Sequence, residues 1–387
     1  EQNRAHKAPT PSASNDPAHH IINIYTSVLL VHVVGQHVFM NTHAHARSLL
    51  AVRLGRVSCF GDNAFRQGSP PAGLGDLASI STGGYFTCVT TANGSVACFG
   101  LNNTNTNVNG VPRDLGPVRL VAAGTWHVCA LTVIDALRCW GNNAFTQSTV
   151  PRGLGLAVAV TAGWGHTCVL LAAGGGARCF GSNKYNESNL DPVTSLGVPI
   201  ASIVAGDNQT CAVTTNGSAI CWGQTDGSGP VPSELGPVLQ VGTPRTSHTC
   251  ALTTSGTVRC WGERAFYNGV EAVSSVVAIS VGFAHVCGLT RSGSLHCFGS
   301  NIKPAFPIMY FVNQATVPLE LRALSGMALA ISAGGYHTCF MQPTREYGTC
   351  GKMCECHCCL VYIMFFLYII VAGTEPVCAA ASACILR

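Results

Sequence analysis

Cysteine is the residue type that could do the most chemistry in this chain, which has 21 of them in 387 residues. The stretch 248–262, HTCALTTSGTVRCWG, holds two cysteines ten residues apart. Its two flanks alternate and are rich in β-branched and aromatic residues, and the polar turn between them contains glycine, which is typical of a β-hairpin. If the turn centres on Ser255, Cys250 lies opposite Cys260 at the ~4.5–5.5 Å separation of facing strand residues, which a disulfide can bridge. Such a bond contributes roughly 2–3 kcal/mol in the chain-entropy model.

The same hairpin recurs along the chain. The first cysteines of the pairs are Cys88, Cys129, Cys168, Cys211, Cys250, Cys287 and Cys339. The second cysteines, each followed by an aromatic residue and a glycine, are Cys59, Cys98, Cys139, Cys179, Cys221, Cys260 and Cys297. Successive first cysteines are 37 to 43 residues apart, except for a last step of 52 residues. A glycine stands five residues before the first cysteine in six repeats, whereas Gly242 stands eight residues before Cys250.

Repeats of this length, built from short strands and glycine turns, predict an all-β fold, a seven-bladed β-propeller. We expect one hairpin disulfide in each blade of about 40 residues, and about four strands per blade. A single blade cannot bury both of its faces, so neighbouring blades must pack around a common axis. The propeller is expected to occupy residues 47–342.

The number of cysteines predicts how the propeller closes. Six pairs are complete within their repeats: Cys88–Cys98, Cys129–Cys139, Cys168–Cys179, Cys211–Cys221, Cys250–Cys260 and Cys287–Cys297. Cys59 then has no upstream partner, and Cys339 is followed by no good second half. We predict a bond between Cys59 and Cys339, so that the two ends of the propeller share the seventh blade and leave no open sheet edge. The alternative is a bond between Cys339 and Cys350, with Cys59 free.

The repeat resembles that of the regulator-of-chromosome-condensation superfamily. The resemblance lies in the pattern G-x-x-H-T/V-C-A-L-x-x-x-G-x-V-x-C-W-G-x-N, clearest at residues 124–142 and 248–262. The cysteine-paired form is similar to the extracellular propellers of crinkly-type plant receptor kinases. That resemblance implies a receptor-ectodomain-like protein, in which a kinase domain would lie outside this chain.

Composition favours an extracellular or cell-surface protein. Ordered pairs among 21 cysteines indicate an oxidising compartment. Glycosylation sequons begin at Asn93, Asn102, Asn186, Asn208 and Asn216. Charged residues make up only 10% and the net charge is +4, with the basic residues scattered, so we expect no nucleic-acid partner.

The two ends of the chain do not fit the repeat. Residues 1–46 form an irregular leader with an apolar run at 21–34, which is either signal-like or spurious sequence. Residues 343–387 form a cysteine-rich, apolar tail, which is either a membrane anchor through residues 358–373 or also spurious. The apolar run of the tail is shorter than the ~20 residues that span a bilayer. The tail sequence C-x-C-H-C-C at 354–359 could bind zinc, but adjacent cysteines make a poor tetrahedral set.

The sequence offers no catalytic site. It contains no G-x-S-x-G elbow, no H-E-x-x-H motif and no kinase signature, so we expect no enzyme, no cofactor and no metal site. The histidines two residues before the first cysteines resemble a ring of ligands: His127, His166, His248, His285 and His337. Phe86 and Gln209 take the same place in other repeats, which favours a structural role for these histidines in hydrogen bonds between blades.

The best-supported function is therefore recognition by a secreted or membrane-anchored propeller that is monomeric by itself. Its contact loops would follow the C-W/F-G strands, at residues 102–110, 142–150, 182–190, 224–229 and 263–269. The candidate anchors on these loops are Phe145, Tyr185, Phe266 and Tyr267, for a protein, peptide or glycan ligand. One alternative is an intracellular guanine-nucleotide-exchange-factor or chromatin-binding propeller. Another is an enzyme inhibitor or lyase on the same scaffold.

Overall fold

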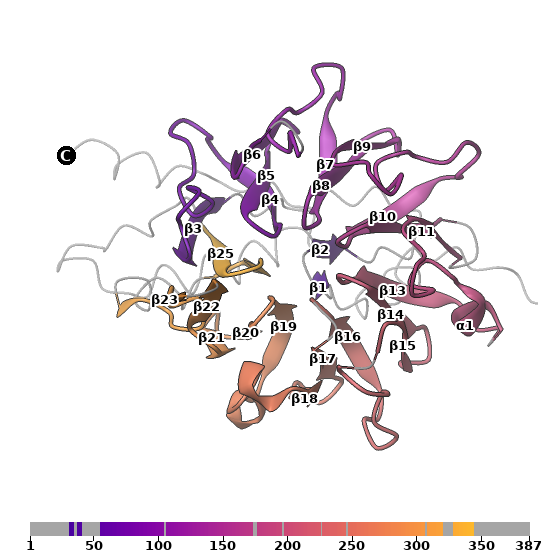
Figure 1. The fold of residues 1–387 in the computed structure, drawn as a ribbon, viewed down its shortest axis with the longest axis vertical. Coiled ribbons are helices and arrows are strands. Elements are labelled where there is room, and N and C mark those ends of the chain that lie inside the picture. Colours follow the sequence, from indigo (N-terminus) through magenta and orange to yellow (C-terminus); the bar gives the residue numbers. More distant parts are fainter. Residues whose placement is uncertain are drawn as a thin grey trace, which may run out of the picture. The chain divides into compact units, whose positions relative to one another are not determined.

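The computed structural model describes residues 31–34, 37–40, 55–103, 106–172, 176–195, 197–225, 227–244, 247–305, 308–319 and 328–343. Seven blades, numbered I to VII here, stand around a common axis (Figure 1). The fold is the predicted all-β, seven-bladed propeller, and each blade is a meander of three antiparallel strands.

Inner strands line the axis, middle strands follow them, and outer strands complete each blade. The inner strands of blades I to VII are β4 (Leu77–Thr82), β7 (Val118–Ala123), β10 (Ala157–Ala162), β13 (Ile200–Ala205), β16 (Val238–Gly242), β19 (Val276–Val281) and β24 (Ala330–Ala333). The middle strands are β5 (Phe86–Thr91), β8 (His127–Thr132), β11 (His166–Leu171), β14 (Gln209–Thr214), β17 (His248–Thr253), β20 (His285–Thr290) and β25 (His337–Pro343). The outer strands are β6 (Val96–Gly100), β9 (Leu137–Gly141), β12 (Ala177–Gly181), β15 (Ala219–Gly223), β18 (Val258–Gly262), β21 (Leu295–Gly299) and β3 (Gly55–Gly61).

The expected fourth strand of each blade is absent from the described residues. The segments that lead to the inner strands instead run as turns and loops, and they carry prolines such as Pro112 and Pro117 before β7 and Pro232 and Pro237 before β16. Proline has no amide hydrogen and cannot donate to a sheet ladder. The outermost position of the blade is therefore occupied by loop.

Apolar side chains from neighbouring blades fill the space between them. Between blades I and II, Phe86 and Cys88 pack against Val121, Val128 and Trp140, all of them buried. Trp140 is the aromatic residue that follows a second cysteine, and the corresponding Phe180 and Trp222 belong to the clusters at the next two seams. The repeated aromatic residue is thus the main packing group between blades.

Each middle strand is bonded covalently to its outer strand. Cys250 lies opposite Cys260 in the register of β17 and β18, as the turn chemistry predicts. The described residues contain seven disulfides: Cys59–Cys339, Cys88–Cys98, Cys129–Cys139, Cys168–Cys179, Cys211–Cys221, Cys250–Cys260 and Cys287–Cys297.

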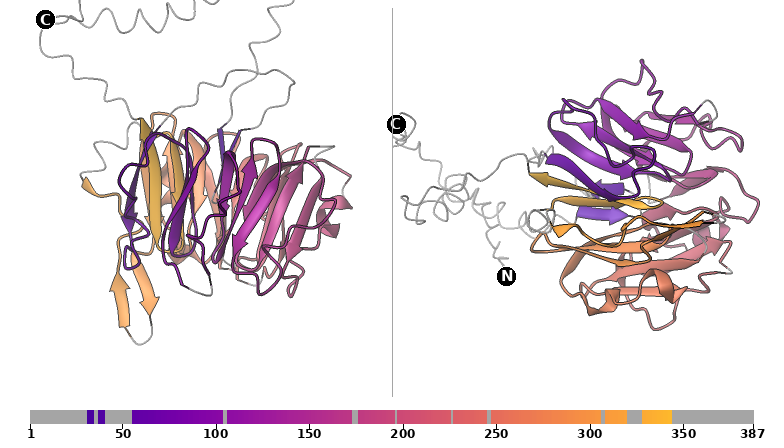
Figure 2. Two further views of the ribbon diagram at one scale, coloured as in Figure 1. Left: turned by 90° about the horizontal axis from the view of Figure 1, so that it is seen from above. Right: turned by 60° about the vertical axis from the view of Figure 1, so that its left-hand side comes forward.

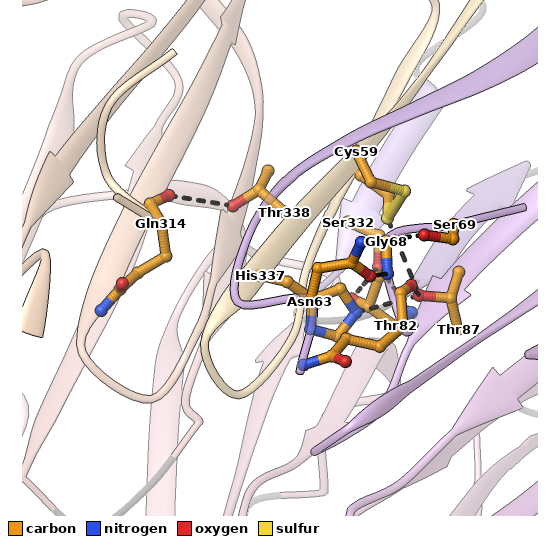
Figure 3. The surroundings of a disulfide bond; sticks show 12 residues. Cys59, Asn63, Gly68, Ser69, Thr82, Thr87, Gln314, Ser332, His337 and Thr338 are labelled. Atoms are coloured by element: carbon orange, nitrogen blue, oxygen red, sulfur yellow. Dashed lines mark hydrogen bonds between the residues drawn. A yellow bond between two sulfur atoms is a disulfide. The ribbon is translucent and has the colours of Figure 1, made fainter. Parts of the chain in front are cut away.

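Blade VII is assembled from both ends of the propeller. The C-terminal strand β25 pairs with the N-terminal strand β3 along its whole length, with Cys339 opposite Cys59. Figure 3 shows the surroundings of this bond, where Thr338 of β25 donates a hydrogen bond to the carbonyl of Gln314. The bond joins residues 280 positions apart, so it closes the ring as the cysteine count predicts.

Other elements are additions to the repeat. Strands β22 (Ile302–Ala305) and β23 (Ile308–Phe311) form an antiparallel pair that projects from the ring (Figure 2) and accounts for the long last step between cysteines. Between the blades lie helix α1 (Asp191–Thr194) and two 3-10 turns, η3 (Arg264–Phe266) and η4 (Val270–Ala272). Strands β1 (Val31–Val34) and β2 (His37–Met40) pair beside the inner strands, within the leader expected to be irregular.

Candidate functional site

The turns between inner and middle strands are tied to one another around one end of the axis. The amide of Thr125 donates to the carbonyl of Gly163 in the next blade (3.0 Å), and the amide of Trp164 donates to the carbonyl of Gly206 (3.1 Å). A Cβ atom on Gly124 would stand 2.4 Å from the Gly163 oxygen. The recurring glycine is therefore required by the close approach of the next blade.

The histidine of each turn continues this link in four blades. His127 Nε2 lies 2.8 Å from the Thr167 hydroxyl of the next blade, and that hydroxyl donates to the carbonyl of Gln147. Since the hydroxyl has only one proton to give, His127 must donate through Nε2. The same relay joins His166 to Thr210, His285 to Thr338 and His337 to Thr87.

These histidines are buried and neutral. Burial, together with a smaller effect of the neighbouring His166, lowers the pKa of His127 from 6.5 to about 3. Burial also lowers the pKa of His166 to about 4, although Glu187 opposes that shift. Within the described residues, no group of three His, Cys, Asp or Glu side chains could hold a metal ion. The geometry gives these histidines a structural position between blades.

Blades I, IV and V lack this relay. In blades I and IV the residue at the histidine position has a partner across the seam, whereas in blade V it has none. Phe86 replaces the histidine of blade I and packs against Val128, which replaces the threonine of blade II. Gln209 of blade IV accepts a hydrogen bond from Thr243 (2.8 Å). His248 of blade V is followed by a valine in the next blade, so its Nε2 has no partner in the described structure, and its ring packs on Phe266.

The loops that follow the outer strands are locked by their own amides. In the loop after β9, the amide of Phe145 donates to Gln147 Oε1 (2.8 Å), and Gln147 Nε2 donates to Asn142 Oδ1 (2.9 Å). The loop after β3 shares the first of these bonds, since the amide of Phe65 donates to Gln67 Oε1 (2.9 Å). Buried glutamines thus hold Phe145 and Phe65 in exposed positions, 42% and 41% exposed.

Aromatic side chains from the turns and these loops gather at the same end of blades VII, I, II and III. Tyr85 stacks on Trp126 with 5.5 Å between ring centroids and meets Phe65 edge-on at 5.8 Å. Phe145 lies 5.0 Å from Trp164. We call these five residues the aromatic arc.

A pocket opens within the aromatic arc between blades II and III. Its volume is about 290 Å³. It is lined by Asn103, Thr106, Trp126, Asn142, Ala144, Phe145, Gln147 and Trp164. None of these side chains is ionisable. The loop after β9 and the turns before β8 and β11 supply the aromatic walls, and residues 103 and 106 reach in from the loop after β6.

The four anchor residues expected from sequence differ in their exposure. Phe145 is exposed and lines the pocket. Tyr185 is partly buried, with the Lys184 ammonium 5.1 Å from its ring centroid. Phe266 is partly buried against His248. The expectation that Tyr267 is exposed is wrong: it is only 9% exposed.

Tyr267 is buried because of the 3-10 turn η3 that precedes it. Its ring packs with Val270 and Val276 in the cluster between blades V and VI, and its hydroxyl donates to the carbonyl of Gly262 (3.2 Å).

Sequence reasoning missed the larger part of the arc, Tyr85, Trp126 and Trp164. The available signal was an aromatic residue between the glycine and the histidine of a turn.

Four of the five sequons have an exposed asparagine: Asn93, Asn102, Asn186 and Asn216. The fifth, Asn208, is partly buried and donates from its side-chain amide to Gln224 Oε1 (3.0 Å). The leader outside its two strands and residues 344–387 lie outside the described part of the chain, and so do the interpretations given to them. Among the described residues, no helix is long and apolar enough to cross a membrane.

Comparison with known proteins defines the class. The Regulator of chromosome condensation (RCC1) repeat matches residues 118–147, 157–187, 200–229, 246–266 and 276–302, in blades II to VI. The protein is therefore a propeller of RCC1-type repeats with a disulfide hairpin in each blade. These matches confirm the resemblance of the repeat in sequence.

Three solved structures are similar to the chain. The entire ectodomain of the Physcomitrella patens receptor kinase CR4 is 25% identical, with a TM-score of 0.52 over 65% of this chain and 68% of that one. Human WBSCR16 is 18% identical, with a TM-score of 0.59 over 75% of this chain and 99% of that one. Prp20p from Saccharomyces cerevisiae, described with its binding properties to Gsp1p and histones, is 14% identical, with a TM-score of 0.59 over 77% and 93%. The last two similarities concern the fold alone.

Proposed function

We propose that this protein is a non-catalytic recognition propeller, exposed to the outside of the cell, that binds its ligand through the aromatic arc. The observation that carries the proposal is the pair of partly exposed indoles, Trp126 and Trp164, set beside the exposed ring of Phe145. Partly exposed aromatic groups on a rigid scaffold are typical anchors of binding sites. The RCC1-type repeats and the similarity to a receptor kinase ectodomain support the same function.

The seven disulfides support the proposed compartment. Bonds of this number persist in oxidising surroundings and are rare where glutathione keeps thiols reduced. Of 21 cysteines, 14 form the disulfides of the described residues, so native protein should present at most 21 − 14 = 7 free thiols. Titration of native protein that yields close to 21 thiols would favour the alternative, an intracellular exchange factor or chromatin-binding propeller.

Binding of the labelled full chain to intact cells tests the recognition role. Trp126→Ala should lower the amount bound at least several-fold, because the substitution removes an anchor of the arc. Ile134→Ser is the control, since residue 134 is exposed in the turn at the other end of β8 and lies away from the arc. Equal binding by both variants would contradict the proposal.

A further inference from the structure

The pocket between blades II and III has a lining that suits one class of ligand. We infer that it binds a neutral saccharide, one or two sugar rings in size, and this inference rests on the recognition function proposed above. A sugar ring presents apolar C–H faces together with hydroxyl groups, so it needs aromatic surfaces and hydrogen-bonding groups side by side. Trp126, Phe145 and Trp164 supply the aromatic surfaces of the pocket, and the amide side chains around them supply the hydrogen-bonding groups.

The two pocket tryptophans keep their indole N–H groups available. Trp140 and Trp222, which pack between blades, donate to the carbonyls of Val108 (2.9 Å) and Glu187 (3.1 Å). In the part of the chain that the structure describes, neither Trp126 nor Trp164 makes such a bond. An indole N–H at a pocket wall can donate to a hydroxyl oxygen, while the ring packs against carbon.

The lining has no charged side chain, which excludes an ionised ligand. An anionic sugar would lose hydration in the pocket and find no cation there to replace it. The next loop along the ring differs, because the place of Ala144, Phe145 and Gln147 is taken by Lys184, Tyr185 and Glu187. The neutral character of the loop after β9 is therefore not imposed by the repeat.

The pocket is rigid and small. The hydrogen bonds within the loop after β9 hold Phe145 in place before any ligand arrives, which lowers the entropy lost on binding. A volume of about 290 Å³ lies at the lower end for ligand pockets. It accommodates one or two sugar rings and excludes a folded partner, which could reach only the rim.

Glycan binding by the purified full chain tests the inference. The probes are immobilised neutral oligosaccharides (cello-, manno-, galacto- and chito-oligosaccharides, and high-mannose N-glycans), with oligogalacturonate and sialylated glycans as acidic counterparts. We expect binding to a neutral probe and none to the acidic ones. Binding to a neutral polysaccharide fragment and binding to a neutral N-glycan would each support the inference. Which of the two binds would show whether the ligand comes from a polysaccharide or from a glycoprotein.

Matched variants tie that binding to the pocket. Phe145→Ala and Trp164→Ala should each weaken binding about tenfold, the loss expected for one aromatic contact. Ile134→Ser is again the control, because residue 134 is exposed, lies away from the aromatic arc and does not line the pocket. Phe145 is exposed, so its removal leaves the folded core intact.

The inference is overturned if the array shows no neutral binder, if acidic probes bind equally, or if Ile134→Ser weakens binding as much as Phe145→Ala does. Failure on the array together with loss of cell binding by Trp126→Ala would reject the saccharide and leave the recognition function standing. Failure of both experiments would reject the two together.

Discussion

His127 and Thr167 belong to different blades, yet His127 Nε2 lies 2.8 Å from the Thr167 hydroxyl and both residues are buried. Because that hydroxyl donates onward to the carbonyl of Gln147, the imidazole keeps its proton on Nε2. Its other nitrogen, Nδ1, has no partner in the described structure. A second proton on this ring would therefore be buried without an acceptor, which explains why the histidine stays neutral.

The propeller should lose stability in acid. The pKa values of His127, His248 and His285 are lowered by burial to about 3, and those of His166 and His337 to about 4, against 6.5 in an unfolded chain. Below pH 6.5 the unfolded chain then binds more protons than the folded one. The stabilisation is complete above pH 6.5 and is lost as the pH falls towards 4 for His166 and His337 and towards 3 for the other three. Each histidine should contribute about 1.4 kcal/mol per pH unit to that slope, measured by denaturant unfolding between pH 4.5 and 7.5.

Single substitutions identify the groups that titrate. His285→Gln should reduce the slope by one histidine's share, since Gln209 shows that the position accepts this side chain. Ile134→Ser, at an exposed position without a titratable group, is the control and should leave the slope unchanged. The explanation fails if the two variants have the same slope.

A methyl group at the inter-blade glycine should prevent stable folding. Gly124→Ala places a Cβ atom 2.4 Å from the Gly163 oxygen, and both backbones are held by hydrogen bonds between blades. We expect a loss of more than ~3 kcal/mol, as is typical of overpacking between rigid groups. Thermal unfolding monitored by circular dichroism measures the effect.

Gly288→Ala is the matched control in blade VI. A Cβ atom there meets nothing closer than 3.5 Å, and the equivalent position of blade II is occupied by Ala130. This variant should be neutral or gain about 0.5–1 kcal/mol, because alanine restricts the unfolded chain. Comparable losses in both variants would show that the close contact at Gly124 is not the cause.

The fold was predictable because each repeat contains the same pattern of cysteines, strand residues and a glycine turn. The spacing of Cys250 and Cys260 around a glycine turn predicts a hairpin, and the recurrence of that hairpin predicts the propeller. The two unmatched cysteines, Cys59 and Cys339, predict the bond that closes the propeller. These inferences need only short-range geometry and counting. The number of strands per blade was overestimated because the prolines before the inner strands were not weighed against a fourth ladder.

The site was less predictable because it is assembled from several blades. Trp126, Trp164 and Tyr85 stand in different repeats. Trp126 and Tyr85 are two residues after the glycine of their turns, and Trp164 is one residue after it. Only the rotation of the blades about the axis brings them beside Phe145 and Phe65. The burial of Tyr267 likewise depends on a 3-10 turn that the loop sequence did not signal.

The closing disulfide should stabilise the propeller more than a hairpin disulfide. Cys59–Cys339 closes a segment of 280 residues, whereas Cys88–Cys98 closes one of 10 residues. In the chain-entropy model the first bond contributes about 5–6 kcal/mol and the second about 3 kcal/mol. The double variants Cys59→Ala/Cys339→Ala and Cys88→Ala/Cys98→Ala should show this order in denaturant unfolding. The reverse order would indicate that the ends of the ring hold together without the bond.

Glycosylation should follow the exposure of the sequons. Asn93 and Asn216 occupy equivalent hairpin turns of blades I and IV, both exposed, so a transferase can reach their amides once the protein is made in a secretory pathway. Asn208 is the internal comparison, because its amide is partly buried and bonded to Gln224. Peptide mass spectrometry before and after enzymatic deglycosylation should find glycan on Asn93 and Asn216 and unmodified Asn208. Glycan on Asn208 would mean that the bond to Gln224 does not form before modification, and the absence of glycan from all three would count against passage through that pathway.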